Sequence, residues 1–147
     1  MKIKKMSNDQ TMKVHKGWTA DKVILEEAEE ILKYFEWDAL LPTPGNSFLV
    51  PEDPGVYIFS TKIEIDGYVF RNPFYIGESN YSIRDRYKVH IYRDEWEKML
   101  ETYGNKFTYS YYLLDEKDAH KSVDLEDTLI RCFGAKLNVK NSKKRRD

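Results

Sequence analysis

The sequence predicts a single domain of the α+β class, with a small three-stranded antiparallel sheet flanked by helices. Three observations lead to this prediction. Stretches rich in Val, Ile, Phe and Tyr are separated by turn signals, as in short strands. Other stretches carry apolar residues at helical spacing. The chain of 147 residues is also long enough for one modest hydrophobic core.

The first predicted element is a helix from Asp21 to Phe35. Its apolar residues recur every three or four positions, and Thr19 or Asp21 is suited to cap its start. Proline and glycine residues break the chain after this helix. We therefore assign residues 1–18 to a flexible basic N-terminus, and residues 19–53 to an extra N-terminal helix and its linker.

The middle of the chain predicts the sheet. Strands are expected at residues 56–60 and 74–76, with an inserted hairpin between them. Asp66-Gly67 between β-rich residues is a strong signal for a two-residue hairpin turn. A run of Phe, Thr and Tyr residues predicts the third strand at residues 106–114.

Two further helices complete the predicted domain. Ser82 is a suitable N-cap for a helix over residues 83–100. The last helix is expected from about residue 119 to residue 133, with Gly134 at the stop position. These helices are expected to cover the sheet.

Charge is distributed unevenly along the chain. Residues 1–16 carry +4 and residues 136–147 carry +5, so the body between them carries −10 in a chain of net charge −1. Basic ends on an acidic body fit a clamp for a polyanion, and they fit solubilising tails equally well. The acidic body argues against tight, nonspecific binding of DNA.

The composition predicts a soluble, cytoplasmic protein with no membrane partner. No apolar run approaches the length needed to span a bilayer. The basic N-terminus lacks the apolar stretch of a secretory signal. Cys132 is the single cysteine, so we expect neither an intramolecular disulfide nor a Cys-based metal cluster.

An ordered set of polar residues points to phosphodiester chemistry. Arg86 and His90 are four residues apart on a predicted helix and therefore share one face. Glu126 is flanked by apolar residues of the last helix, where a buried carboxylate needs a partner or a metal. The set comprises two motifs and the residues that follow them: Gly55-Val56-Tyr57, Tyr75-Ile76-Gly77, Arg86, His90, Glu126 and Asn138.

Hydrolysis of a phosphodiester has three requirements. The attacking water must lose a proton, the charge that grows on the phosphate oxygens must be neutralised, and the leaving oxygen must be stabilised. A divalent metal serves the last two needs. Mg²⁺ is held adequately by one Glu together with water and substrate phosphate. Arg is a permanent bidentate donor to phosphate, and Tyr and His relay protons. The polar set therefore contains the residue types that a one-metal nuclease site requires.

Over residues 54–141 the chain resembles the GIY-YIG nuclease superfamily. Both tyrosine motifs match, the first with Val56 where Ile is usual. The family has a helix in which an Arg precedes a His by one turn, and this pattern selects Arg86 rather than Arg84. A Glu and a closing Asn follow in the family's order. Each motif alone is weak, whereas six matches in the right order are specific.

The resemblance implies a compact nuclease domain with one divalent metal, Mg²⁺ or Mn²⁺, on Glu126. Tyr57 would help to activate water, assisted by Tyr75 or His90. Arg86 would bind the scissile phosphate and stabilise the charge that develops on it. These implied roles define the candidate catalytic residues.

The implied activity is hydrolysis of duplex or branched DNA by an endonuclease, without a covalent intermediate. Asn138 would support the site through hydrogen bonds. A homodimer is compatible with this activity because one site cuts one strand, and the inserted hairpin would contact substrate or a second subunit. Backbone phosphates would be contacted by basic residues near the site and in the basic tail at residues 142–147: Arg84, Lys88, Arg93, Lys143, Lys144, Arg145 and Arg146.

Two other interpretations remain open. A noncatalytic DNA- or protein-binding module that kept the fold would be expected to have lost the Arg or the Glu of the site, and neither is lost here. An interaction protein with an accidental resemblance would leave Glu126 without a metal. Taken alone, Arg86 also fits a surface ion pair with Asp85 or Asp94.

Overall fold

The structure is a computed structural model, and it describes residues 21–134. The helices are α3 (Lys22–Leu32), α4 (Ile83–His90), α5 (Asp94–Tyr103) and α6 (Ser122–Phe133). The strands are β1 (Glu36–Leu40), β2 (Gly55–Ile65), β3 (Tyr68–Ser79) and β4 (Phe107–Leu113). Three short 3₁₀ turns are η1 (Pro44–Leu49), η2 (Gly104–Lys106) and η3 (Glu116–Lys121). The predictions for the N-terminus at 1–18, for Asn138 and for the basic tail lie outside the described residues.

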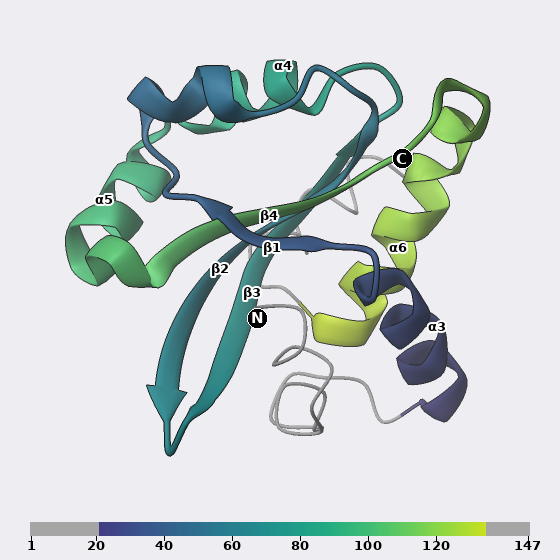
Figure 1. The fold of residues 1–147 in the computed structure, drawn as a ribbon, viewed down its shortest axis with the longest axis horizontal. Coiled ribbons are helices and arrows are strands. Elements are labelled where there is room, and N and C mark those ends of the chain that lie inside the picture. The colour runs from purple at the N-terminus through teal and green to yellow at the C-terminus, as the bar shows by residue number, and fades with distance from the viewer. Residues whose placement is uncertain (1–20, 135–147) are drawn as a thin grey trace.

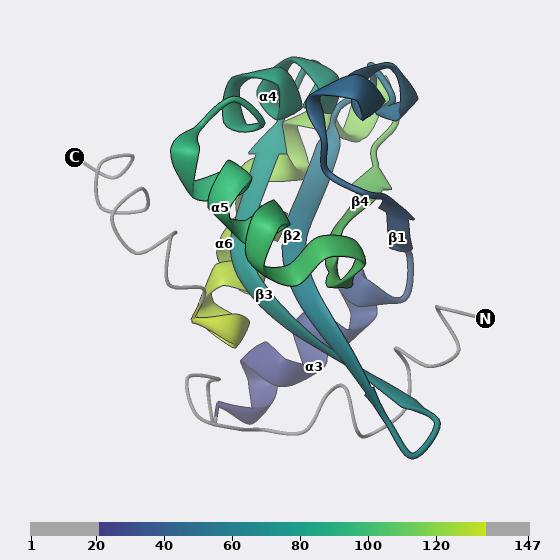
Figure 2. The same cartoon turned by 90° about the vertical axis from the view of Figure 1, so that its left-hand side faces the viewer.

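The four strands form one antiparallel sheet in the order β1-β4-β2-β3 (Figure 1). Helices α4 and α5 lie on one side of this sheet, and α3 and α6 lie on the other (Figure 2). Each side has its own hydrophobic core, built from the side chains that alternate along the strands. The α+β class predicted from the sequence is therefore confirmed.

The prediction of three strands is wrong, because β1 forms a fourth. The helix predicted to reach Phe35 ends at Leu32, and the chain then enters β1. This strand pairs with β4 alone, in an irregular register, and Asp38 within it has a left-handed φ of 53°. A short strand that depends on one tertiary pairing and carries a backbone irregularity has little local sequence signal.

Strands β2 and β3 form one long hairpin that carries both tyrosine motifs. The hairpin covers residues 55–79 and reverses at Asp66-Gly67, where both residues have positive φ. The predicted turn is confirmed, but the expected inserted hairpin is the outer end of the two motif strands themselves. Because β4 pairs with β2 only as far as Thr61, the outer ribbon projects from the body (Figure 1).

The helix predicted over residues 83–100 is divided into α4 and α5. The hydroxyl of Ser82 caps α4 by accepting a hydrogen bond from the amide of Asp85, at 3.3 Å. The break after His90 redirects the chain so that Trp96 of α5 stacks on the imidazole, with ring centroids 5.2 Å apart. Periodicity alone does not reveal this break, because the apolar pattern continues across it.

A buried ion pair connects the two edge strands of the sheet. Arg71 of β3 donates two hydrogen bonds to the carboxylate of Asp38 in β1, at 2.6 and 3.2 Å. The two side chains are only 2% and 6% exposed. The strands β2 and β4 lie between these two edge strands, and they carry the small buried residues Ser60 and Thr108 at paired positions. The guanidinium also lies 5.0 Å from the ring centroid of Trp37, which adds a cation–π contact.

This ion pair predicts a stability that depends on pH. Burial by itself would raise the pKa of Asp38, but the hydrogen bonds and charge of Arg71, with Lys62 nearby, hold it below its usual value of 3.8. A carboxyl whose pKa is lowered by folding stabilises the protein above its unfolded pKa, and the stabilisation is lost as the pH falls through the folded pKa. We expect Asp38→Asn to lower the free energy of unfolding by about 3 kcal/mol near neutral pH. In urea titrations, this difference should shrink as the pH falls below 3.8.

Asp66→Asn provides a matched control for this experiment. Asp66 also has a φ of 53°, but it lies exposed at the hairpin turn. Asn tolerates the left-handed conformation as well as Asp does, so neither substitution strains the backbone. We expect little change in stability for Asp66→Asn. A difference for Asp38→Asn that stayed constant across the acid range would contradict the role given to the ion pair.

Candidate active site

The candidate site begins with Tyr57 of β2, whose ring lies across Gly77 of β3. These residues are direct partners in the antiparallel register. A Cβ atom at Gly77 would overlap the ring and hydroxyl of Tyr57. At Gly55, a Cβ atom would overlap the carbonyl oxygen of Tyr112 in β4. Both motif glycines are therefore required, because neighbouring atoms lie too close to their backbone for a side chain to fit. At Gly77, the missing side chain leaves room for the ring of Tyr57 over the edge strand.

Tyr57, Tyr75 and His90 form one buried aromatic cluster. The hydroxyl of Tyr57 lies 3.0 Å from Nε2 of His90. The ring of Tyr75 is in edge contact with the imidazole, with centroids 4.6 Å apart. His90 is 1% exposed, because Trp96 also stacks on it. The α4 helix thus brings His90 to both motif tyrosines.

Burial makes His90 a neutral imidazole. Desolvation, together with the charges of Arg93 and Arg86, lowers the pKa of His90 to about 3. One ring nitrogen of a neutral imidazole is a donor and the other is an acceptor. Within the described residues, Nδ1 is buried without a hydrogen-bond partner, whereas Nε2 faces Tyr57. When Nε2 is the acceptor, the phenolic hydroxyl of Tyr57 can donate a hydrogen bond to it.

Arg86 is the cation beside the two tyrosines. Burial, and then the proximity of Tyr75, raise the pKa of Tyr57 above its usual value near 10. The charge of Arg86 and its hydrogen bond to Tyr57 act in the opposite direction without reversing the shift. Tyr57 is therefore a neutral phenol at physiological pH. Arg86 remains exposed, which leaves its guanidinium accessible to a substrate phosphate.

Glu126 lies on α6 and interacts electrostatically with Tyr57. Its side chain is 4% exposed, and its charge contributes to the raised pKa of Tyr57. The helix packs against β2 and β3, so the carboxylate comes from the opposite side of the sheet to His90. The structure thus brings together Tyr57, Tyr75, Arg86 and His90, and the charge of Glu126 acts on Tyr57 from α6.

The chemistry of Glu126 fits a hard divalent cation. In residues 21–134, no group of three or more His, Cys, Asp or Glu side chains is arranged to hold a metal. A cation on Glu126 would therefore take most of its ligands from water and substrate phosphate, as Mg²⁺ commonly does. A structural zinc site normally needs four protein ligands, and the described residues do not offer them together.

Glu78 is a site residue that sequence reasoning missed. Its carboxylate accepts a 2.6 Å hydrogen bond from the hydroxyl of Ser122, the first residue of α6. Its charge also contributes to the raised pKa of Arg86, after the larger effect of Tyr57. The only local signal was the position of Glu78 directly after the second motif. Its contacts join elements that are distant in the sequence, so spacing does not reveal them.

Of the basic residues near the site that are predicted to contact DNA, one is hydrogen-bonded within the protein and two are exposed. Nε of Arg84 donates to the carbonyl oxygen of Val50 at 2.7 Å, and its Nη2 donates to that of Phe48 at 3.0 Å. Arg84 thus holds the η1 turn against α4, and its guanidinium is occupied within the protein. Lys88 and Arg93 are exposed and stay candidates for contact with phosphate.

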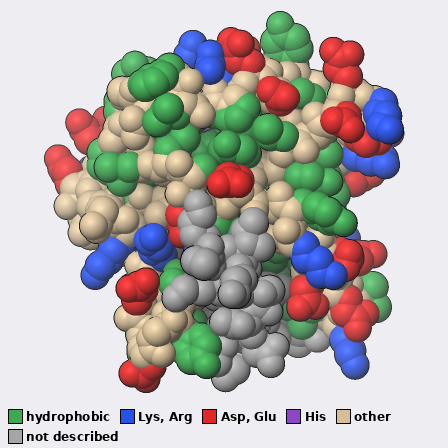
Figure 3. All heavy atoms as spheres, viewed as in Figure 1, with side chains coloured by type: hydrophobic (Ala, Val, Ile, Leu, Met, Phe, Trp, Pro, Cys, Tyr) green, Lys and Arg blue, Asp and Glu red, His purple; other side chains and the backbone are tan. Residues whose placement is uncertain are grey.

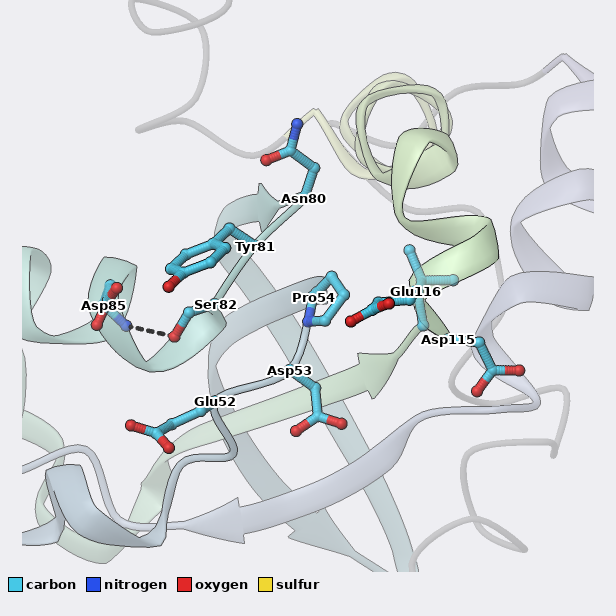
Figure 4. Close-up of a pocket in the computed structure, with 10 residues that line it drawn as sticks. Glu52, Asp53, Pro54, Asn80, Tyr81, Ser82, Asp85, Asp115 and Glu116 are labelled. Atoms are coloured by element: carbon cyan, nitrogen blue, oxygen red, sulfur yellow. Dashed lines mark hydrogen bonds between the residues drawn. The ribbon is translucent and has the colours of Figure 1, made fainter.

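A pocket of about 550 Å³ lies beside the start of β2 and of α4 (Figure 4). None of the five catalytic candidates lines it. Its lining includes five carboxylate side chains, whose charge would repel a phosphate. They belong to Glu52, Asp53, Asp85, Asp115 and Glu116. This pocket is therefore not the candidate nuclease site.

The face drawn in Figure 3 has no dominant basic region among the described residues. Acidic and basic side chains are intermingled on that face (Figure 3). None of the helices within residues 21–134 has the length and apolarity needed to cross a bilayer.

Comparisons with known proteins found no relative. No family model matches the chain, and neither a curated protein nor a solved structure matches it. The interpretation of the site therefore depends on the residues and on their geometry.

Proposed function

We propose that the protein is a metal-dependent endonuclease that hydrolyses the phosphodiester bonds of DNA, as its resemblance to the GIY-YIG nucleases implies. One observation carries this proposal. The buried hydroxyl of Tyr57 in β2 contacts His90 and interacts with Arg86, both from α4, and the charge of the buried Glu126 acts on it from α6. Convergent groups of these types support phosphoryl chemistry better than a purely structural role.

Arg86 is suited to bind the phosphate that is cleaved. Its guanidinium is exposed and lies next to Tyr57, so it can donate two parallel hydrogen bonds to nonbridging oxygens. These bonds strengthen as charge develops on the oxygens in the transition state. Glu126 would hold the divalent cation, which when bound supplies charge neutralisation and an activated water.

Tyr57 and His90 would help to position the attacking water. Nε2 of His90 lies 3.0 Å from the hydroxyl of Tyr57, so the neutral imidazole can accept the phenolic hydrogen and the oxygen of Tyr57 can accept a hydrogen bond from the water. Burial lowers the pKa of His90 to about 3, so His90 acts as this acceptor and does not keep the proton that the water loses. Tyr75 packs on the imidazole and keeps its orientation.

Cleavage of supercoiled plasmid and of a labelled four-way junction tests the proposal. We expect nicking with Mg²⁺ or Mn²⁺ and none with EDTA. Arg86→Lys should lower kcat by about a hundredfold, because an ammonium cannot replace the bidentate guanidinium. Arg84→Lys is the matched control, since Arg84 binds carbonyl groups of the η1 turn and should affect cleavage much less.

The absence of cleavage by the wild-type protein with every metal and substrate would overturn the proposed function. A gel shift under the same conditions would then separate the alternatives. Retained DNA would favour a noncatalytic DNA-binding module, and no retention would favour a protein-interaction module.

A further inference from the structure

We propose that Trp96 is a positioning residue of this site, whose indole holds the imidazole of His90 in the orientation in which Nε2 meets the hydroxyl of Tyr57. The inference rests on the proposed function and adds a residue that the ordered motifs do not include. Three structural observations support it. They concern the second nitrogen of the imidazole, the rings that enclose it, and the break between α4 and α5.

The imidazole of His90 is not oriented by a hydrogen bond at its second nitrogen. A functional histidine commonly has its ring fixed by a hydrogen bond at the nitrogen that does not take part in the chemistry. Within residues 21–134, Nδ1 of His90 is buried without such a partner, and Nε2 is the nitrogen that meets Tyr57. One contact at Nε2 does not define the plane of the ring. The packing around the imidazole must therefore define it.

Trp96 covers a face of this imidazole, whereas the other aromatic neighbours meet it at steep angles. The planes of the indole and the imidazole are inclined by only 17°, with ring centroids 5.2 Å apart. The rings of Tyr57, Phe59 and Tyr75 are inclined to the imidazole by 62°, 75° and 62°. In a close-packed interior, a ring stacked on a face prevents the imidazole from tilting toward that side. Trp96 thus defines the plane of the imidazole.

The indole of Trp96 is itself held in place by the sheet. Its side chain is only 2% exposed. Its ring centroid lies 5.1 Å from that of Phe59 in β2, and 5.9 and 5.5 Å from those of Phe74 and Tyr75 in β3. An indole enclosed in this way is a rigid surface for the imidazole to stack on.

The break between α4 and α5 brings Trp96 onto the imidazole. His90 and Trp96 are six residues apart, so in one continuous helix their side chains would project about 120° apart. The chain instead leaves α4 after His90, and Arg93 adopts an extended backbone conformation before α5 begins at Asp94. This interruption of the helix is what allows the two rings to stack.

Enclosure of the imidazole also keeps it neutral. Burial is the main cause of the lowered pKa of His90, and the charges of two arginines act in the same direction. Without the indole of Trp96, water would reach the ring, so the pKa of His90 would rise toward its ordinary value of 6.5. An imidazolium has no acceptor at Nε2 for the phenolic hydrogen of Tyr57. The titratable groups that face the ring are two guanidinium groups and two phenols, those of Arg86, Arg93, Tyr57 and Tyr75.

The imidazole signals of His90 in a ¹⁵N-labelled protein test this role without requiring catalysis. His90→Gln identifies the signals by their loss. In the wild-type protein, they should remain those of a neutral ring from about pH 8 down to about pH 5. Trp96→Leu keeps an apolar side chain but removes the stacked ring, and we expect His90 to titrate within this range. Trp96→Phe restores a flat ring and should return the signals to those of the wild type.

Trp37→Leu is the matched control for the loss of a buried tryptophan. Trp37 is fully buried, but it lies in the core beneath α3 and α6, on the other side of the sheet. This variant should lose stability and leave the His90 signals unchanged. An unchanged titration of His90 in folded Trp96→Leu protein would overturn the proposal. The same change in Trp37→Leu, or no restoration in Trp96→Phe, would also overturn it.

The wild-type protein provides a further test in case Trp96→Leu does not fold. Stacked rings bring their protons close together, so we expect nuclear Overhauser effects between the indole of Trp96 and the imidazole of His90. The absence of these effects in the wild-type protein would overturn the proposal.

Cleavage kinetics separate a positioning role from a general structural one. Trp96→Leu should lower kcat by about ten- to a hundredfold, as expected when a functional group is misplaced, with little change in KM for DNA. The loss relative to the wild type should grow as the pH falls, because more of the His90 population is imidazolium. A loss of equal size from about pH 8 to about pH 5 would overturn the proposal. If the wild-type protein does not cleave DNA, the proposed function fails, while the His90 signals still decide the role of Trp96.

Discussion

Replacement of Glu126 by alanine is expected to abolish cleavage that depends on metal, with a loss in kcat of about a thousandfold or more. Glu126 is the buried carboxylate of α6 at the candidate site, and its charge contributes to the raised pKa of Tyr57. Within the described residues, no cluster of ligands is available to replace it. Single-turnover nicking of plasmid with Mg²⁺ is the measurement, because it reports the chemical step apart from product release.

Two control variants and a binding measurement make this result specific. Glu126→Gln has almost the same shape without the charge and should fail like the alanine variant. Glu101→Ala removes an exposed glutamate and should cleave normally. Mg²⁺ should raise the melting temperature of the wild-type protein but not that of Glu126→Ala, since a ligand stabilises only the state that binds it. Cleavage that survived in Glu126→Ala would show that the metal residue is assigned wrongly.

Substitution of Gly77 by alanine is expected to destroy activity without removing any reactive group. The added methyl group would occupy the space of the Tyr57 ring and hydroxyl, so the tyrosine would have to leave its place beside His90 and Arg86. Overpacking of this kind typically costs about 1–3 kcal/mol of stability. We therefore expect a lower free energy of unfolding in urea together with a loss of cleavage.

The effect of Gly77→Ala should depend on the ring of Tyr57. In a Tyr57→Leu background the clash is reduced, so the additional destabilisation by Gly77→Ala should be smaller than in the wild-type protein. Gly45→Ala is the matched control, because its nearest neighbour would be the hydroxyl oxygen of Thr43 at 3.9 Å. Wild-type stability and cleavage in Gly77→Ala would contradict the close approach of the two strands.

Local signals in the sequence account for much of the secondary structure. The Asp66-Gly67 turn and the Ser82 cap occur as predicted, and Gly134 ends α6 with a left-handed φ of 60°. These features depend on one or a few neighbouring residues, whose conformational preferences are local properties. By contrast, β1 depends on pairing with β4 and on the ion pair between Asp38 and Arg71, which join distant parts of the chain.

For the site, the sequence by itself determined which reactive side chains are present and in what order. It also placed Arg86 and His90 on one helical face, because a helix repeats every 3.6 residues. Only the tertiary structure decided how these groups act. Burial makes His90 neutral, the register lays Tyr57 over Gly77, and Glu78 binds Ser122 of α6. Protonation states and partners follow from desolvation and from contacts between distant segments, and neither is encoded in local spacing.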